Sequence, residues 1–364
     1  DVETGGVLAL YGGPDFVKDS RNWATTARPT GSTFKPYALG AALDQGFTLN
    51  DKLNGSQFTP PGENTPVRNA GDRNYGTFFF NDTATTEIYT AYVDLEGQMD
   101  DGPENTLAFA QAAGLPKAAG WEPISRVPLG IPEVSPLSQA TGYATFARDG
   151  KHIDTHVVAQ VKDASGAVVY AADTSAEQTV DADVANDVAY ALTNVVQDGT
   201  AARAGNMGFP IAGKTGTYYI RDAAGGSKTT ACWFVGMSKQ IATAVMYVAG
   251  DSGVEDLETY KRPQDGTFFG STYPLMTWVD YMTIATDGMP VEKFDRPRDI
   301  RAERGKTAGP SRSGSPSASP SPSPTPTESP TPTPTRTVEP EQTPTPTTEP
   351  TTEPTATPTS IGAR

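Results

Sequence analysis

The sequence contains one cysteine and two histidines, and no apolar run reaches the roughly 18 residues that a membrane-spanning helix needs. The single cysteine, Cys232, excludes an internal disulfide framework and a zinc site built from several thiolates. It lies in the apolar run TTACWFVGM, which predicts a buried structural thiol in a strand. His152 and His156 lie in the β-branched stretch KHIDTHVVAQV, which favours a strand without a third metal ligand. We therefore expect surface histidines, and a Ser-His-Asp mechanism has few candidates.

Positive charge is scarce, since the net charge is −15. Residues 301–364 hold 15 of the 32 prolines, and their six Lys/Arg balance six Asp/Glu, so the net charge lies in residues 1–300. Repeats such as SPSPTPTESPTPTPT have almost nothing apolar to bury, which predicts disorder with polyproline character. We expect a folded domain over 1–297 and a disordered tail over 298–364. The acidic surface argues against nucleic acid as a partner.

Helical and strand periodicities are mixed within residues 1–300 and predict an α/β arrangement with antiparallel strands and helices packed on them. Helices are expected over 34–46, 104–115, 135–150 and 181–200. Ser135 is a candidate N-cap, and Gly150 is a candidate C-terminal stop. Strands are expected over 5–12, 156–163, 167–173, 230–238 and 241–250.

The motif STFK runs from Ser32 to Lys35. If a helix begins near Ser32, both side chains lie on one face, so the amine can reach the hydroxyl. A serine becomes a nucleophile when a base takes its proton, and a lysine serves as that base if burial or a neighbouring cation lowers its pKa. The helix N-terminus adds positive potential for an oxyanion. Alone the motif is weak, because an ordinary helix start has the same pattern.

A second motif, AGKTGT, covers 212–217. Lys214 supplies a second cation, Thr215 and Thr217 supply hydroxyls for a carboxylate, and Gly216 lets the backbone pass close to a ligand. A glycine turn in an edge strand would explain this motif alone. The two motifs in this order, about 180 residues apart, match the Ser-x-x-Lys and Lys-Thr-Gly parts of the penicilloyl-serine set.

The chain resembles the transpeptidase domain of a bifunctional (class A) penicillin-binding protein of actinobacterial type. The resemblance covers most of 1–295, in the stretches 4–16, 31–43, 67–76, 129–147, 195–205, 212–217, 232–236 and 269–282. It implies a penicillin-binding/serine beta-lactamase-like fold, with an antiparallel sheet flanked by helices and a helical subdomain.

The resemblance implies that Ser32 attacks the stem peptide D-Ala-D-Ala, with Lys35 as general base. The backbone amides of Ser32 and Thr217 would form the oxyanion hole. The substrate carboxylate would be bound by Lys214, Thr215 and Thr217, along the strand that contains Gly216. An amine from a neighbouring strand would resolve the acyl-enzyme and form the crosslink. Beta-lactams would acylate Ser32, and no metal or cofactor is expected.

The same resemblance implies that an N-terminal membrane anchor and a glycosyltransferase domain precede this chain in the full-length protein. The transpeptidase domain would then be extracytoplasmic, associated with the cell membrane only through that missing anchor. The Pro/Thr-rich tail fits an extracytoplasmic extension. The expected partners are peptidoglycan stem peptides and beta-lactams.

The third motif of the family, Ser-x-Asn, is absent. It should directly precede TAYVDLEGQ (90–98), where Glu87, Ile88 and Tyr89 stand, and no serine occurs between Ser56 and Ser125. The ten residues NDTATTEIYT (81–90) are the in-frame translation of a common short-read sequencing adapter, and the preceding FFF corresponds to poly-T. We interpret 78 to about 89 as assembly contamination that replaces genuine residues. The alternative is a Phe-rich strand followed by an Asn-Asp turn.

This interpretation separates two expectations. The natural protein should be an active transpeptidase, whereas the polypeptide as written should be impaired, because Glu87 and Tyr89 cannot replace a hydroxyl relay and an amide clamp.

Two other functions remain open. A hydrolase of the same superfamily, either a D,D-carboxypeptidase or a beta-lactamase, is disfavoured because no Glu-containing loop is suited to activating water. A non-catalytic penicillin- or cell-wall-sensing module would use the fold without turnover.

Overall fold

The computed structural model describes residues 1–297 apart from 16, 18–19, 80–87, 198 and 222–225. All of the described residues belong to one compact unit, Asp1–Ser311. The predicted disordered tail, 298–364, lies outside the described residues, as does most of the segment interpreted as contamination. The division at residue 297 therefore stays a prediction.

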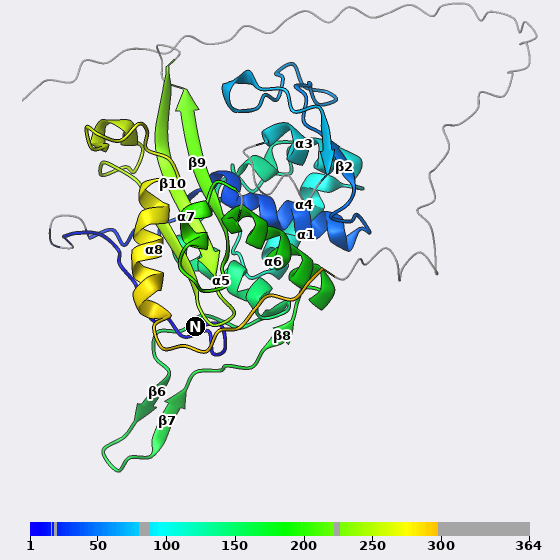
Figure 1. Ribbon diagram of the computed structural model, residues 1–364. Coiled ribbons are helices and arrows are strands. Elements are labelled where there is room, and N and C mark those ends of the chain that lie inside the picture. Colours follow the sequence, from blue (N-terminus) through cyan, green and yellow to red (C-terminus); the bar gives the residue numbers. More distant parts are fainter. Residues whose placement is uncertain (16, 18–19, 80–87, 198, 222–225, 298–364) are drawn as a thin grey trace, which may run out of the picture. The chain divides into compact units, whose positions relative to one another are not determined.

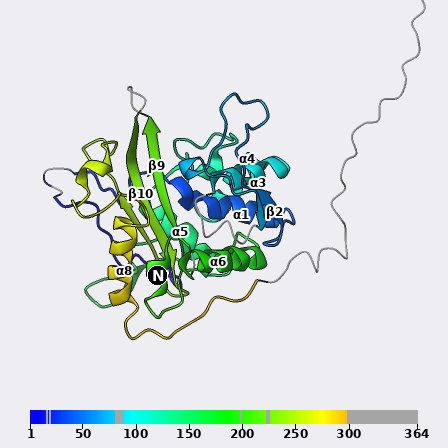
Figure 2. The ribbon, with the colours of Figure 1, turned by 45° about the horizontal axis from the view of Figure 1, so that its top comes forward.

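A three-stranded antiparallel sheet forms the centre of the fold, in the order β11-β10-β9. Its strands are β9 (Ala212–Arg221), β10 (Ser227–Met237) and β11 (Ala242–Tyr247). Helix α8 (Tyr273–Ala285) covers one face, and α5 (Pro136–Ala147) and α6 (Ala182–Gln197) cover the other (Figures 1 and 2). The predicted antiparallel sheet with helices packed on it is confirmed.

A second group of helices packs beside the sheet: α1 (Lys35–Asp44), α3 (Tyr89–Gln98) and α4 (Gly102–Ala112) contact one another, and α1 also contacts α6. This is the expected helical subdomain. Nine of the ten residues of α1 are buried, so the helix is apolar on all sides, as a central helix should be. Phe34 and Tyr37 join Tyr143 and Phe146 of α5 in one aromatic cluster that ties both helix groups together. The start of α1 is therefore fixed between the two parts of the domain.

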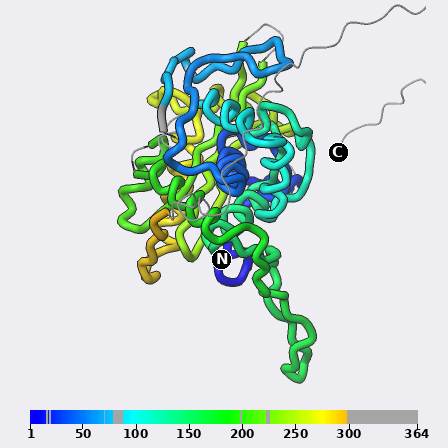
Figure 3. The backbone as a smooth tube through the Cα atoms, turned by 90° about the vertical axis from the view of Figure 1, so that its right-hand side faces the viewer, coloured from blue at the N-terminus to red at the C-terminus, as the bar shows by residue number. Residues whose placement is uncertain are grey.

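Short strand pairs surround this centre. They are β1 (Arg28–Pro29) with β4 (Glu133–Val134), β2 (Lys52–Asn54) with β3 (Thr77–Phe79), β5 (Lys151–His152) with β8 (Glu177–Gln178), and β6 (Gln160–Lys162) with β7 (Val168–Ala171). The β6–β7 hairpin projects away from the helices and the central sheet (Figures 1 and 3). Short helical segments include α7 (Ala202–Gly205) and the 3₁₀ helices η1 (Gly31–Phe34), η2 (Ala70–Asp72), η3 (Val127–Leu129) and η4 (Leu257–Tyr260).

All four predicted helices are confirmed, and Ser135 caps α5 by accepting a hydrogen bond from the Ser138 backbone N–H at 3.1 Å. Four of the five predicted strands are also present. The prediction for 5–12 is wrong: only Gly6 forms a bridge, with His156. Across the described ranges, no helix is both long and apolar enough to span a bilayer.

The cysteine and the two histidines, which the sequence predicts to be structural, lie where expected. Cys232 is fully buried, and its thiol contacts the Phe268 carbonyl oxygen at 3.2 Å. His152 and His156 are partly exposed. Within the part of the chain that the structure describes, no group of three His, Cys, Asp or Glu side chains is placed to hold a metal ion.

Candidate active site

Ser32 lies in the 3₁₀ turn η1 that leads directly into α1, and only 3% of its surface is exposed. Two backbone hydrogen bonds fix this turn, because the N–H groups of Thr30 and Gly31 both donate to the Gly130 carbonyl, at 3.0 and 3.1 Å. Gly31 has φ of +54°, in the left-handed region that favours glycine. The predicted helix start at STFK is thus confirmed, with Ser32 in the opening turn.

Lys35 is the first residue of α1 and is fully buried. Its ammonium lies 4.8 Å from the ring centre of Tyr89 and 4.9 Å from that of Tyr92. The same Nζ donates to the Ile88 carbonyl oxygen at 3.4 Å. Ile88 and Tyr89, the last two residues of the expected Ser-x-Asn position, therefore lie directly against Lys35. Glu87 is outside the described residues.

Strand β9 brings the second motif to η1. A Cβ atom added to Gly216 would lie 2.5 Å from the Thr30 carbonyl oxygen, and one added to Gly31 would lie 2.7 Å from that of Thr217. Only glycine allows this approach of strand to turn. Because β9 is an edge strand of the central sheet, one of its backbone edges faces away from β10. The two motifs, 180 residues apart in the chain, therefore meet.

The side chains of the second motif are buried and anchored. Lys214 is 1% exposed. The Thr215 and Thr200 hydroxyls are 2.9 Å apart, and the Thr217 hydroxyl accepts a hydrogen bond from the Gly270 N–H at 3.2 Å. The sequence does not mark Thr200 and Gly270 as site residues, although both lie in stretches that carry the resemblance. Their role depends on tertiary contact, which their sequence positions do not reveal.

A further contact missed by the sequence analysis holds the start of α3. The Asn69 amide oxygen accepts from the Thr90 backbone N–H at 3.1 Å and from its hydroxyl at 3.0 Å, while its amide nitrogen donates to the Gly55 carbonyl at 2.7 Å. Asn69 is 4% exposed and lies in 67–76 (VRNAGDRNYG), one of the stretches that carry the resemblance. A buried asparagine that bonds on both sides fixes the helix that approaches Lys35.

The segment interpreted as contamination is described only at its ends. Thr77–Phe79 form β3, which pairs with Lys52–Asn54, so the alternative of a strand at the Phe run is present there. Residues 80–87 are outside the described residues. A strand at this position does not test the origin of the codons, and contamination stays a hypothesis.

Comparison with known families identifies one match over more than half of the chain. Residues 1–85 and 108–265 match the family described as "Penicillin binding protein transpeptidase domain". The interval between these two ranges includes residues 86–107, and thus the position where Ser-x-Asn is missing.

Individual relatives agree with this match. Penicillin-binding protein 1A of Mycolicibacterium smegmatis is 30% identical over 85% of this chain and 40% of its own length. Penicillin-binding protein 1A of Neisseria flavescens is 29% identical over 84% of this chain and 37% of its own length. The chain thus spans about 40% of these relatives. The structure of PonA1 from Mycobacterium tuberculosis with penicillin V is similar, with a TM-score of 0.71, 26% identity, and coverage of 82% of this chain and 79% of the chain in that structure.

Proposed function

Because the chain belongs to the family of penicillin-binding protein transpeptidase domains, we propose that it is a serine D,D-transpeptidase that crosslinks peptidoglycan stem peptides through an acyl-enzyme on Ser32. The observation that carries this proposal is the junction of η1 and β9. There the turn that contains Ser32 and leads into Lys35 lies against the glycine-rich strand that contains Lys214.

In the acylation step, the Ser32 hydroxyl attacks the carbonyl between the two terminal D-alanines, and Lys35 accepts the hydroxyl proton. The peptide C–N bond breaks, the last D-alanine leaves with a proton on its amine, and an ester to Ser32 remains. An amine of a neighbouring stem peptide then attacks the ester, the C–O bond breaks, and the proton returns to Ser32. Atoms and charge balance without a metal or cofactor in either step.

Two backbone N–H groups stabilise the oxyanion in this proposal, those of Ser32 and Thr217. Ser32 is the second residue of η1, so its N–H has no acceptor within its own helix. Support for pairing it with Thr217 comes from the Gly31–Thr217 approach of the two backbones. Donors fixed before the reaction stabilise developing charge without reorganisation.

Substrate binding follows from the edge position of β9. An extended peptide adds along a free strand edge through main-chain hydrogen bonds. Lys214 provides positive charge near this edge, and the hydroxyls of Thr215 and Thr217 provide donors for the substrate carboxylate. Beta-lactams acylate Ser32 by the same attack. The complex of the relative PonA1 with penicillin V supports this extension to the present chain.

The chain as written is impaired in this proposal. Tyr89 is at the position of the expected asparagine and its ring faces Lys35, so it provides no amide for the substrate. A variant with Glu87→Ser and Tyr89→Asn restores the motif.

The test measures acylation by a fluorescent penicillin in the chain as written, in this restored variant, and in the restored variant with Ser32→Ala. We expect faster acylation after restoration, on the order of a hundredfold, which is the usual contribution of a proton relay. The Ser32→Ala protein should form no adduct. Equal rates with and without restoration would refute the impairment, and labelling without Ser32 would refute the nucleophile.

Two other functions predict different outcomes. A D,D-carboxypeptidase or beta-lactamase would transfer the acyl group to water, so the penicilloyl adduct would not persist for hours. A penicillin- or wall-sensing module would bind stem peptides equally well after Ser32→Ala and would transfer none. Transfer of a labelled stem peptide to an amine acceptor by the restored protein separates the transpeptidase from both.

A further inference from the structure

A chain of hydrogen bonds, which the proposed mechanism does not use, holds the Ser32 turn from its buried side. The Thr33 hydroxyl donates to the Thr30 carbonyl oxygen at 2.9 Å, and Nε2 of Gln139 in α5 donates to the Thr33 hydroxyl at 3.2 Å. The Tyr37 hydroxyl of α1 donates to Oε1 of Gln139 at 2.8 Å. All four of these residues are fully buried. The chain of bonds therefore joins α1 and α5 to the residues on both sides of Ser32.

Each bond in this chain can run in one direction only. The Thr30 carbonyl oxygen can only accept, so the Thr33 hydroxyl donates its proton there and must accept from the Gln139 amide nitrogen. The Gln139 amide oxygen then accepts from Tyr37. Burial raises the pKa of the Tyr37 hydroxyl well above its usual value, so this donor keeps its proton. A buried network in which every member has one orientation holds its parts in one arrangement.

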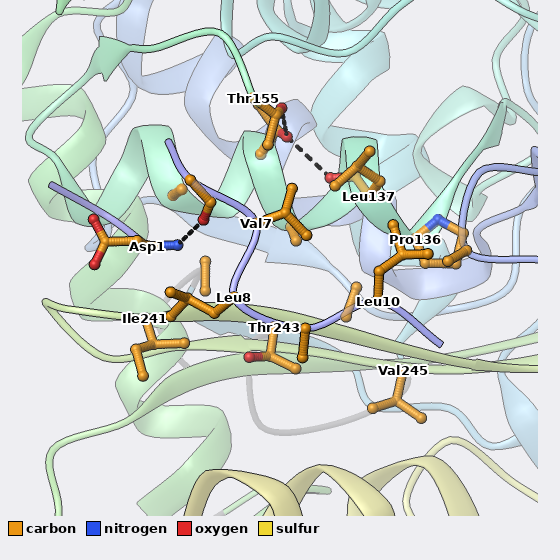
Figure 4. Close-up of a pocket in the computed structure, with 18 of the residues that line it drawn as sticks. Asp1, Val7, Leu8, Leu10, Pro136, Leu137, Thr155, Ile241, Thr243 and Val245 are labelled. Atoms are coloured by element: carbon orange, nitrogen blue, oxygen red, sulfur yellow. Dashed lines mark hydrogen bonds between the residues drawn. The ribbon is translucent and has the colours of Figure 1, made fainter. Parts of the chain in front are cut away.

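A second bond from α5 reaches the same turn. The fully buried Tyr143 hydroxyl donates to the Thr33 backbone carbonyl oxygen at 3.0 Å. Gln139 and Tyr143 are four residues apart, so both lie on one face of α5, toward η1. Leu137 lies on another side of the helix, where it lines an apolar cavity beside the N-terminal segment (Figure 4). One face of α5 is therefore bonded to the turn that contains Ser32.

The side chain of Thr33 also lies against β9. A Cβ atom added to Gly216 would lie 2.9 Å from the Cγ2 methyl group of Thr33. The hydroxyl of Thr33 thus holds the turn, while its methyl group contacts the strand that contains Lys214. Because Ser32 directly precedes Thr33, a movement of this residue would shift Ser32 relative to β9.

We propose that Thr33 and Gln139 are positioning residues for acylation, because their hydrogen bonds hold the Ser32 hydroxyl where it can attack the substrate carbonyl. The inference rests on the proposed function, since it takes Ser32 as the nucleophile. A reacting group that is displaced by about 1 Å can lose on the order of a hundredfold in rate. Loss of the network should therefore slow the chemical step and leave the first, noncovalent binding of penicillin unchanged.

The test uses the Glu87→Ser, Tyr89→Asn protein as parent and follows acylation by a fluorescent penicillin at several concentrations. This separates the dissociation constant of the first complex from the first-order acylation rate. We expect Thr33→Val to lower the first-order rate at least about tenfold at an unchanged dissociation constant. Thr33→Ser keeps the hydroxyl and should keep most of the rate. Thr145→Val is the matched control, because it removes another fully buried hydroxyl of α5, which bonds to the Ala113 carbonyl oxygen at 2.9 Å.

Equal acylation rates in Thr33→Val and Thr145→Val would overturn the inference, and so would a change confined to the dissociation constant. Gln139→Met removes one bond of the network and leaves Thr33 intact. It takes the place of Thr33→Val if that protein does not fold, with a loss of the same size expected.

Hydrogen exchange at the amides of 30–35 gives a measurement that does not depend on activity. Thr33→Val should speed this exchange roughly tenfold, and Thr145→Val should not. Unchanged exchange in Thr33→Val would also overturn the inference. If the parent protein is not acylated at all, the proposed function fails, and the exchange still decides whether the network fixes the turn.

Discussion

Lys35 is the general base in the proposed mechanism, so its surroundings bear on how readily Ser32 would react. Two tyrosine rings lie within 5 Å of its ammonium, and such cation–π contacts stabilise the charged form, typically by about 0.5–2 kcal/mol. A general base must instead be neutral when it accepts a proton. Tyr92 lies in TAYVDLEGQ, which should directly follow the Ser-x-Asn motif, whereas Tyr89 stands where the asparagine of that motif is expected. Tyr89 lies in the segment that we interpret as contamination, so we infer that its ring is not part of the natural site.

Replacing Tyr89 alone tests this effect. We predict that Tyr89→Asn raises the rate of penicillin acylation by about tenfold, because one ring is removed from the ammonium and an amide is supplied. Tyr89→Phe is the matched control, since it keeps the ring and should leave the rate nearly unchanged. An equal gain in both variants would show that the ring is not responsible.

The buried carboxyl group of Glu96 makes the stability of the fold depend on pH. Burial in α3 raises its pKa from 4.5 to about 9, with the nearby Glu104 carboxylate adding to the rise. The folded protein therefore holds a proton that the unfolded chain releases above about pH 4.5. We predict that the free energy of unfolding falls as pH rises from about 5 to 9, by at most about 1.4 kcal/mol per pH unit from this group.

Chemical denaturation at several pH values shows whether the free energy of unfolding falls as pH rises. Variants of single residues show which group causes the fall. Glu96→Gln should flatten this part of the profile because it removes the titrating group. The exposed Glu122→Gln should leave the profile as it is. A profile that is unchanged in Glu96→Gln would place the pH dependence elsewhere.

At the scale of elements, the close contact between β9 and η1 depends on glycine at position 216. We predict that Gly216→Ala lowers the acylation rate of the restored protein on the order of a hundredfold, because its Cβ would lie 2.5 Å from the Thr30 carbonyl and must move β9 away from Ser32. Gly97→Ala is the matched control, since its Cβ meets no atom within 4 Å. Unaltered acylation in a folded Gly216→Ala protein would contradict the proposed site.

The cap of α5 offers a stability test. Ser135→Ala removes the oxygen that accepts from the Ser138 N–H, so we predict a loss of about 1 kcal/mol in the free energy of unfolding. Ser138→Ala removes only the contact between the two hydroxyls, 2.9 Å apart, and should cost less. Equal losses in the two variants would mean that the cap is not the source of the stability.

The elements that the sequence predicts well are those whose signals are local. Ser135 caps α5 as its sequence predicts, and the helix ends at Ala147, three residues before the predicted stop at Gly150. The buried strand around Cys232 is marked by its apolar run. The prediction for 5–12 fails because an apolar run forms a strand only where a neighbouring strand pairs with it, and within the described residues only Gly6 forms a bridge, with His156. Asn69, Thr200 and Gly270 were not found because their contacts join segments far apart in the chain.

At the scale of the whole molecule, two motifs separated by most of the domain converge on one buried site. The helical subdomain places the start of α1, and the central sheet places β9, so the site depends on both parts being packed together. Disturbing either part should therefore reduce acylation without any change in Ser32 itself.

The central claim is that Ser32 is the nucleophile of this domain. The most direct measurement treats the Glu87→Ser, Tyr89→Asn protein with penicillin V, digests it, and locates the added mass by tandem mass spectrometry. The account predicts one penicilloyl group, attached to Ser32 within GSTFK. An adduct on any other residue, or full-length folded protein without an adduct, would contradict it.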